Sequence, residues 1–249
     1  MEHVDAEPRL SEMSTHWTVV FQAHSGTPEE MNAAVSRLMC RYGGAVHRYL
    51  LKAVKDPDVA AELDQEFAVR FLRGDFRNSD PTRGRFRDYV KRAVQNLITD
   101  YYRRKRATRT VQSSGQEPAV QDPGLARFEK QFIESWRADL LDRAWHALSE
   151  LEKNTGHPFH TVLRSRVDNP GLTSSILAER LSTQLGRPLS AGAVRQALQR
   201  SRRKYVEFLL TEVLASLNRP SQDELEEELS DLRLLDYCRP FMKPRADSA

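Results

Sequence analysis

The chain has 249 residues, of which 39% are hydrophobic and 29% are charged, and its formal net charge is +3. Such a composition is typical of a folded protein, and the length suits one large domain or two small ones. No stretch reaches the roughly 20 apolar residues of a membrane span, and the acidic N-terminus lacks the apolar core of a signal peptide, so we expect a cytoplasmic protein without membrane contact.

Apolar residues recur at intervals of three and four along nearly the whole chain, which predicts an all-α fold. Residues 1–13 are expected to be disordered, and a short helix is expected near Trp17. Thr27, Pro28 and Glu30 form a typical helix start, with an N-cap, a proline in the first turn and a glutamate at the third position. Gly43 and the glycine after it predict a break.

The segment Asp56-Pro57-Asp58 is expected to end one helix and cap the next. The next helix runs from Val59 to Arg73 with an apolar stripe, and it carries acidic side chains on its other faces. Gly74 is expected to end it, and a loop rich in turn residues follows.

The segment from Arg83 to Arg109 predicts a strongly basic helix. Ten Lys or Arg and two Asp give it a net charge of +8, far above that of the whole chain. Its apolar stripe begins at Phe86. Tyr89, Tyr101 and Tyr102, with Gln95 and Asn96, accompany the charges. Aromatic rings stack on bases, amides read base edges and arginines hold phosphates, so this mixture favours DNA contact over a merely solvated basic face.

Residues 108–126 are poor in large apolar residues and predict a flexible linker. A second helical block, residues 127–218, starts with a long apolar stripe from Phe128 to Leu148. Thr173 is expected to cap a helix that ends at Leu185, with Ile176, Leu177, Ala178 and Leu181 facing inward. A turn follows, and Ser190 caps a helix rich in Arg and Gln. This pair fits a helix-turn-helix.

Residues 219–249 form an acidic extension. Seven Asp or Glu and one Arg give residues 221–236 a net charge of −6, and Leu225, Leu229 and Leu232 predict one apolar face. We expect this amphipathic helix to dock on the rest of the chain, with its carboxylates near basic DNA-binding surface, so that the tail inhibits binding of promoter DNA or core polymerase. The alternative is that it only extends the second domain, packing on Leu214 and Leu217.

The order of these features resembles the extracytoplasmic-function (group IV) sigma factors of the sigma-70 family. The phrases STHWTVV, DQEFAVRFLRGDF, DPTRGRFRDYV and ELEEELSDLR resemble in particular a branch abundant in planctomycete-type bacteria. The first part of the likeness is an acidic motif, Asp58, Glu62, Leu63, Asp64, Gln65, Glu66 and Phe67. The second is Phe86, Arg87, Tyr89, Val90, Asn96, Asp100, Arg103 and Arg104, with Tyr89 in place of a tryptophan. The third is Leu177, Ala178, Leu181, Ser190, Gly192, Val194, Leu198, Arg200 and Arg202, with a turn about four residues longer than usual.

The resemblance implies that residues 14–107 are a region 2-like domain that binds core RNA polymerase and the promoter minus-ten element. It implies contact of Glu62, Gln65 and Glu66 with the clamp of the β′ subunit. It implies minus-ten contacts, including capture of a flipped base by the loop, for Phe76, Arg77, Asn78, Ser79, Asn96, Asp100, Arg103, Arg104 and Arg106.

The resemblance further implies that residues 127–218 are a region 4-like domain that reads the minus-thirty-five element and meets the β flap. The implied base and phosphate contacts are Arg195, Gln196, Gln199, Arg200, Arg202 and Arg203. The linker would thread toward the RNA exit path. The function implied is promoter-specific initiation, by a chain that is a monomer when free and acts at the nucleoid, with or without an anti-sigma regulator.

Two other classes of protein remain as alternatives. A helix-turn-helix regulator that works without polymerase would use the second block alone, and it leaves the acidic helix before the loop unexplained. A partner that sequesters a sigma factor is disfavoured by the basic charge. An enzyme is not expected, because the seven histidines are scattered and no metal site, phosphate loop or nucleophile motif is present. We therefore predict no catalytic residue, metal or cofactor.

Overall fold

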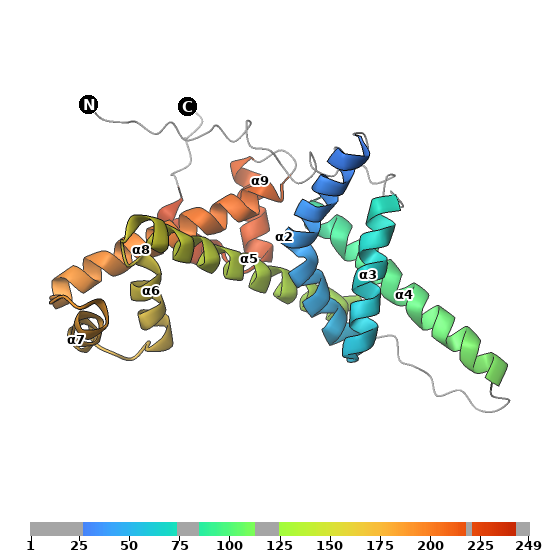
Figure 1. The fold of residues 1–249 in the computed structure, drawn as a ribbon, viewed down its shortest axis with the longest axis horizontal. Coiled ribbons are helices and arrows are strands. Elements are labelled where there is room, and N and C mark those ends of the chain that lie inside the picture. The colour runs from blue at the N-terminus through green and yellow to red at the C-terminus, as the bar shows by residue number, and fades with distance from the viewer. Residues whose placement is uncertain (1–26, 74–84, 113–124, 218–220, 243–249) are drawn as a thin grey trace. The chain divides into compact units, whose positions relative to one another are not determined.

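The computed structural model describes residues 27–73, 85–112, 125–217 and 221–242, and in these ranges the chain is helical, with no strand (Figure 1). This confirms the predicted all-α fold. The helices are α2 (Pro28–Val54), α3 (Pro57–Arg73), α4 (Phe86–Gln112), α5 (Leu125–Thr155), α6 (Phe159–Asp168), α7 (Ser174–Leu185), α8 (Ala191–Ala215), α9 (Gln222–Asp231) and α10 (Leu235–Cys238), followed by the 3-10 turn η3 (Arg239–Phe241).

The described residues form two compact units. The first contains the chain up to Asp139 together with Leu214–Leu232, and the second contains Leu140–Val213 together with the chain from Arg233 onward. The chain passes between the units three times: inside α5, inside α8, and between Leu232 and Arg233, just after the end of α9. This division differs from the boundaries expected from the sequence, which assigned α5 to the second block.

Local capping explains where α2 and α3 begin. The Thr27 hydroxyl accepts a hydrogen bond from the Glu30 amide, and the Glu30 carboxylate accepts one from the Thr27 amide, so the predicted start is a complete capping box. A carboxylate oxygen of Asp56 accepts hydrogen bonds from the amides of Asp58 and Val59, as expected for the next cap. These contacts depend only on neighbouring residues, so the sequence predicts them well.

The break expected at Gly43 and Gly44 is wrong, because α2 continues through both residues. The structure gives one of them a packing role. A Cβ atom at Gly44 would lie 2.9 Å from Oδ1 of Asp139 on α5, whereas a Cβ at Gly43 would meet nothing within 4 Å. That Asp139 oxygen accepts a hydrogen bond of 2.7 Å from Arg48, one turn further along α2. Gly44 therefore lets α5 approach α2 closely.

The core of the first unit is an aromatic cluster built around the beginning of α5. Trp136 is 1% exposed and stacks on Tyr42 of α2, with ring centroids 4.7 Å apart. Phe86 of α4 lies 4.8 Å from the same tyrosine ring, and Phe132 of α5 meets Tyr49 edge-on at 5.2 Å. These contacts explain why residues 125–139 belong to the first unit.

The second unit packs α6, α7 and α8 around the remainder of α5. Trp145 of α5 lies 4.9 Å from the ring of Tyr205 on α8. Leu177, Ala178 and Leu181 of α7 are buried as predicted. Ile176 is 43% exposed, so the prediction that it also faces inward is wrong. A helix ten to twelve residues long buries one narrow stripe, and Ile176 lies beside that stripe rather than on it.

The acidic segment of the C-terminal extension forms a short capped helix that belongs to the first unit. The Ser221 hydroxyl and the Glu224 carboxylate form the capping box of α9. Leu225, Leu229 and Leu232 are all buried, which agrees with the predicted apolar face. Cys238, in α10 of the second unit, and Cys40 are free thiols, and burial raises the pKa of Cys238 to about 11.

Candidate nucleic-acid interface

The basic helix α4 has a buried side and an exposed side, as its sequence predicts. Phe86, Val90, Ala93 and Leu97 are buried, although the core stripe also includes Tyr89, Val94 and Ile98. The opposite side exposes a second stripe at steps of four, three, four and three residues, which consists of Arg92, Asn96, Thr99, Arg103 and Arg106. Residues at these steps share one face of a helix. The stripe thus presents three guanidiniums and an amide to solvent.

One of the aromatic residues expected on this surface belongs to the core instead. Tyr89 is only 8% exposed, and its ring lies 5.9 Å from that of Phe86. Burial raises the pKa of the Tyr89 hydroxyl. Tyr101 and Tyr102 are half-buried with rings 5.2 Å apart, and the ammonium of Lys105 lies 5.5 Å from the Tyr101 ring centroid. The aromatic surface available for stacking on α4 is therefore this tyrosine pair.

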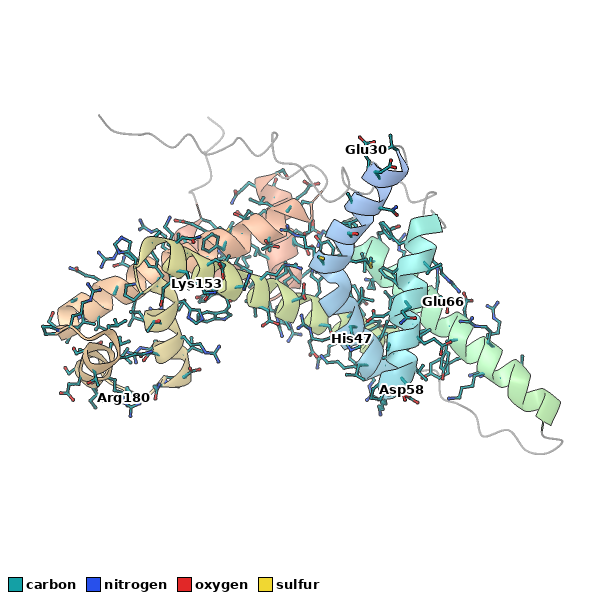
Figure 2. The ribbon with its side chains drawn as sticks, viewed as in Figure 1. Glu30, His47, Asp58, Glu66, Lys153 and Arg180 are labelled. Carbon is teal, nitrogen blue, oxygen red and sulfur yellow. The ribbon has the colours of Figure 1, made fainter. Side chains whose placement is uncertain are left out.

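The residues expected to bind polymerase do not all share one surface of α3. Glu62 and Gln65 are exposed, on the same side of the helix as Asp58. Glu66, which Figure 2 labels on α3, instead accepts hydrogen bonds of 2.6 Å from Arg70 and 2.7 Å from Arg104 of α4. Glu62 and Gln65 thus lie on the outer face of α3, whereas Glu66 faces α4.

Two of the residues expected to contact the minus-ten element belong to the same ion-pair network. Arg70 donates a hydrogen bond of 2.9 Å to Asp100 while it also holds Glu66, and Arg104 completes the chain of charges. Burial alone would raise the pKa of Glu66, but the hydrogen bonds from Arg104 and Arg70 outweigh it and lower that pKa. The network joins α3 to α4 and fixes Asp100, whereas Asn96, Arg103 and Arg106 lie on the exposed stripe.

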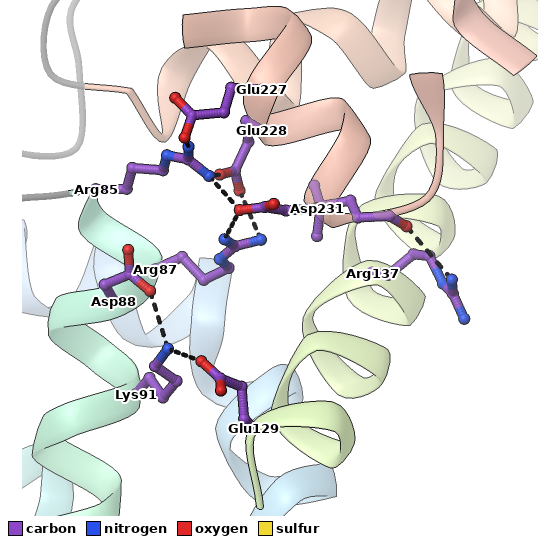
Figure 3. Close-up of polar contacts among 10 residues, drawn as sticks. Arg85, Arg87, Asp88, Lys91, Glu129, Arg137, Glu227, Glu228 and Asp231 are labelled. Carbon is purple, nitrogen blue, oxygen red and sulfur yellow. Dashed lines mark hydrogen bonds and ion pairs between the residues drawn. The ribbon is translucent and has the colours of Figure 1, made fainter. Parts of the chain in front are cut away.

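A second charge cluster lies at the beginning of α4, where α9 packs (Figure 3). Arg85 lies 2.6 Å from Glu227, 2.8 Å from Glu228 and 2.6 Å from Asp231. Arg87 lies 3.2 Å from Glu228 and 3.0 Å from Asp231. The carboxylates of the acidic helix therefore meet the basic helix at its first turn. The charge pattern of the sequence predicts that the acidic helix lies near basic surface, but it does not identify these two arginines.

Further polar contacts hold α4, α5 and α9 in place. The ammonium of Lys91 lies 3.1 Å from Asp88 and 2.8 Å from Glu129 of α5, and Arg137 of α5 donates a hydrogen bond of 3.3 Å to the carbonyl of Leu232 (Figure 3). Lys91 is thus directed at α5 and does not join the exposed stripe. The Arg137 bond occupies a carbonyl at the end of α9, where helix carbonyls lack partners within the helix.

In the second unit, α7 and α8 are joined by a short turn whose caps match the prediction. The Thr173 hydroxyl accepts from the Ile176 amide, and Gly186 ends α7 with a φ of 64°. The Ser190 hydroxyl accepts from the Ala193 amide at the start of α8. The Leu189 amide also donates a hydrogen bond of 2.8 Å to the Ser182 hydroxyl, which holds this turn against α7.

Helix α8 separates its polar and apolar residues sharply. Val194, Leu198 and Tyr205 are buried. All six residues that the resemblance assigned to the minus-thirty-five element are exposed, namely Arg195, Gln196, Gln199, Arg200, Arg202 and Arg203. The first half of α8 therefore offers guanidiniums and amides that can pair with base edges and phosphates.

Several expectations lie outside the described residues: the loop residues Phe76, Arg77, Asn78 and Ser79, the short helix near Trp17, and most of the linker. Helix α4 extends to Gln112, so residues 108–112 of the expected linker are helical. Within the described ranges, no helix is both long and apolar enough to cross a membrane, and no cluster of three or more His, Cys, Asp or Glu could hold a metal ion.

Residues 38–108 match the family model described as Sigma-70 region 2. The match covers the aromatic residues of α2, the acidic helix α3 and the basic helix α4, which are the elements described above. It identifies this part of the chain as a sigma-70 region 2 domain, and it supports a sigma factor of the sigma-70 family, a class that binds RNA polymerase for promoter-specific initiation. No curated protein and no solved structure matches the chain.

Proposed function

We propose that this chain is a group IV sigma factor of the planctomycete-type branch, which binds bacterial core RNA polymerase and directs it to promoters. The observation that carries the proposal is the region 2 match over an α4 that buries Phe86 and Tyr89 and exposes a stripe of arginines. The protein acts in the cytoplasm at the nucleoid, without a metal or cofactor.

The outer face of α3 is the surface proposed to bind the β′ clamp. Glu62 and Gln65 are exposed there and can pair with basic side chains of a partner. Glu66 is proposed in a different role from the one that the resemblance implies. Because Arg70 and Arg104 already hold its carboxylate, it joins α3 to α4.

The exposed stripe of α4 is the surface proposed for the minus-ten element. Asn96 can read a base edge, and Arg103 and Arg106 can hold phosphates. Arg104 and Asp100 contribute less directly, because both belong to the network of Arg70 and Glu66. The loop containing Phe76–Ser79 is proposed to capture the flipped base.

The exposed side of α8 is proposed to read the minus-thirty-five element in the major groove, as the recognition helix of a helix-turn-helix. The second unit is also proposed to meet the β flap. Arg195 and Gln199 are one turn apart on the exposed side of the helix, so both can reach neighbouring base pairs. Each good bidentate contact discriminates against a wrong base by about 1–3 kcal/mol.

In vitro transcription tests this function. Core polymerase and the purified chain are incubated with a library of randomised promoters, and the transcribed templates are sequenced. We expect enrichment of two sequence elements separated by a fixed spacer, together with co-purification of the chain and core polymerase. A chain that fails to bind core polymerase, but binds specific duplex DNA tightly by itself, would instead be a helix-turn-helix regulator.

A matched pair of variants assigns the α3 surface. Glu62→Gln should weaken binding to core polymerase, because it removes an exposed charge from the proposed contact. Glu179→Gln removes an exposed charge from α7 and serves as the control. Equal binding of the two variants would remove Glu62 from the proposed contact.

A further inference from the structure

The stripe of exposed residues on α4 has a first member that is not available to solvent. Arg85 precedes Arg92 by seven residues, two helical turns, so it belongs to the same face as Arg92, Asn96 and Arg103. Yet the Arg85 side chain is only 18% exposed, because three carboxylates of α9 surround it. Arg87 beside it is 4% exposed. The arginines at the beginning of α4 are therefore covered by α9, whereas Arg92 and Arg103 further along the helix are exposed to solvent.

The cover is held by both apolar and ionic contacts. Leu229 and Leu232 are 0% exposed, and Leu225 is 5% exposed. Glu228 is also 0% exposed, and burial raises its pKa even though two guanidiniums oppose that effect. For Asp231 the balance is reversed, because hydrogen bonds from both arginines outweigh burial and lower its pKa. The leucines thus attach α9, and the carboxylates determine what it covers.

We propose that Arg85 and Arg87 form a phosphate-binding site for promoter DNA, and that α9 occupies this site in the free chain. A guanidinium binds carboxylate and phosphate oxygens with the same planar fork, so three carboxylates on one helix match a site for backbone phosphates. Arg85 lies on the face that the proposed function assigns to DNA, and Arg87 reaches two of the same carboxylates, Glu228 and Asp231, from another side of the helix. The inference rests on that function only for the identity of the nucleic acid.

The consequence is direct competition. While α9 is docked, Glu227, Glu228 and Asp231 neutralise the arginine pair and exclude phosphates from it. When DNA binds there, α9 leaves, and Arg85 and Arg87 at the beginning of α4 become available to phosphates. The free chain therefore binds DNA more weakly than its basic helix alone would.

The first test compares two triple variants that raise the net charge of the chain equally, by three. The release variant is Glu227→Gln, Glu228→Gln and Asp231→Asn. The control variant is Asp223→Asn, Glu226→Gln and Asp236→Asn, which changes three carboxylates of the same C-terminal segment outside the cluster. The probe is a fluorescently labelled random 30-base-pair duplex, and its anisotropy is measured over a series of KCl concentrations.

We expect the release variant to bind the duplex about tenfold more tightly than the control at low salt. Its plot of log affinity against log salt should be steeper by about two, because each newly contacted phosphate adds roughly 0.9 to the slope. Adding Arg85→Ala and Arg87→Ala to the release variant should abolish the gain. Equal affinities and slopes for release and control variants would overturn the proposal.

The second test needs no substitution, so it remains decisive if the release variant is unstable. Hydrogen exchange of residues 222–231 is measured in the wild-type chain, alone and saturated with the same duplex. DNA should accelerate exchange in α9, and unchanged or slower exchange would overturn the proposal. Polymerase is absent from both tests, so failure here leaves the sigma factor assignment intact, and failure of transcription leaves this result intact.

Discussion

Replacing Leu229 by Ala should destabilise the first unit strongly, because its side chain is fully buried where α9 packs. Truncating a buried leucine removes transfer free energy and leaves a cavity, which together cost about 2–5 kcal/mol. Since α9 has only ten residues and can undock as a body, the loss cannot exceed its docking free energy, so we expect the lower part of that range. For a unit of this size, each kcal/mol lowers Tm by roughly 2–4 °C.

Urea unfolding followed by circular dichroism measures this loss, with Ser230→Ala as the matched control. Ser230 is the next residue and is exposed, so its truncation should change the free energy of unfolding by less than about 0.5 kcal/mol. Adding Leu225→Ala to Leu229→Ala should cost less than the sum of the single effects if the helix undocks as a unit. If Leu229→Ala and Ser230→Ala behaved alike, α9 would not be docked in solution, and the masked arginine site would fail with it.

Three further predictions concern α2, the ion-pair network and the proposed DNA surfaces. Gly43→Ala should stabilise the first unit by about 0.5–1 kcal/mol through helix propensity, whereas Gly44→Ala should gain less or destabilise, because its Cβ would crowd a carboxylate oxygen of α5; equal gains in urea unfolding would contradict this packing role. The folded-state pKa of Glu66 is lowered, so its stabilising contribution is present above about pH 4.5 and is lost as pH falls through the folded value; the difference in unfolding free energy between wild type and Glu66→Gln should therefore shrink in acid, and a pH-independent difference would exclude the ion pairs as its source. Arg103→Ala should weaken DNA binding across sequences and reduce the salt slope by about one, while Gln199→Ala should relax promoter-library preference at one or two distal positions and leave the salt slope nearly unchanged; identical effects of the two variants would refute the division between phosphate and base contacts.

The features that the sequence predicted best are those decided by near neighbours. The capping box at Thr27, the caps at Thr173 and Ser190 and the glycine end of α7 at Gly186 involve residues within a few positions of one another. The exposed residues of α8 follow from a periodic pattern that needs no knowledge of the remaining chain. Local chemistry therefore predicted the helices and the surfaces that they expose.

The features that the sequence missed depend on what packs from elsewhere. Gly44 suggests a break until α5 is known to approach it, and Tyr89 looks like a surface aromatic until Phe71 and Phe86 surround it. Charge alone suggested that the acidic helix meets basic surface. It could not identify Arg85 and Arg87, because many arginines along α4 offer the same charge, and only the buried leucines of α9 determine the position.

The first unit is discontinuous in sequence, and this affects how the protein can be made. Trp136 enters its aromatic core from α5, and α9 completes it only after residues 140–213 have been synthesised. During synthesis on the ribosome, α2, α3 and α4 emerge before α9 exists to pack against them. The nascent chain thus lacks the buried leucines of α9 and carries an unneutralised arginine pair until residue 232 leaves the exit tunnel. A fragment that ends in the expected linker would keep that immature state permanently, because it lacks both Trp136 and α9.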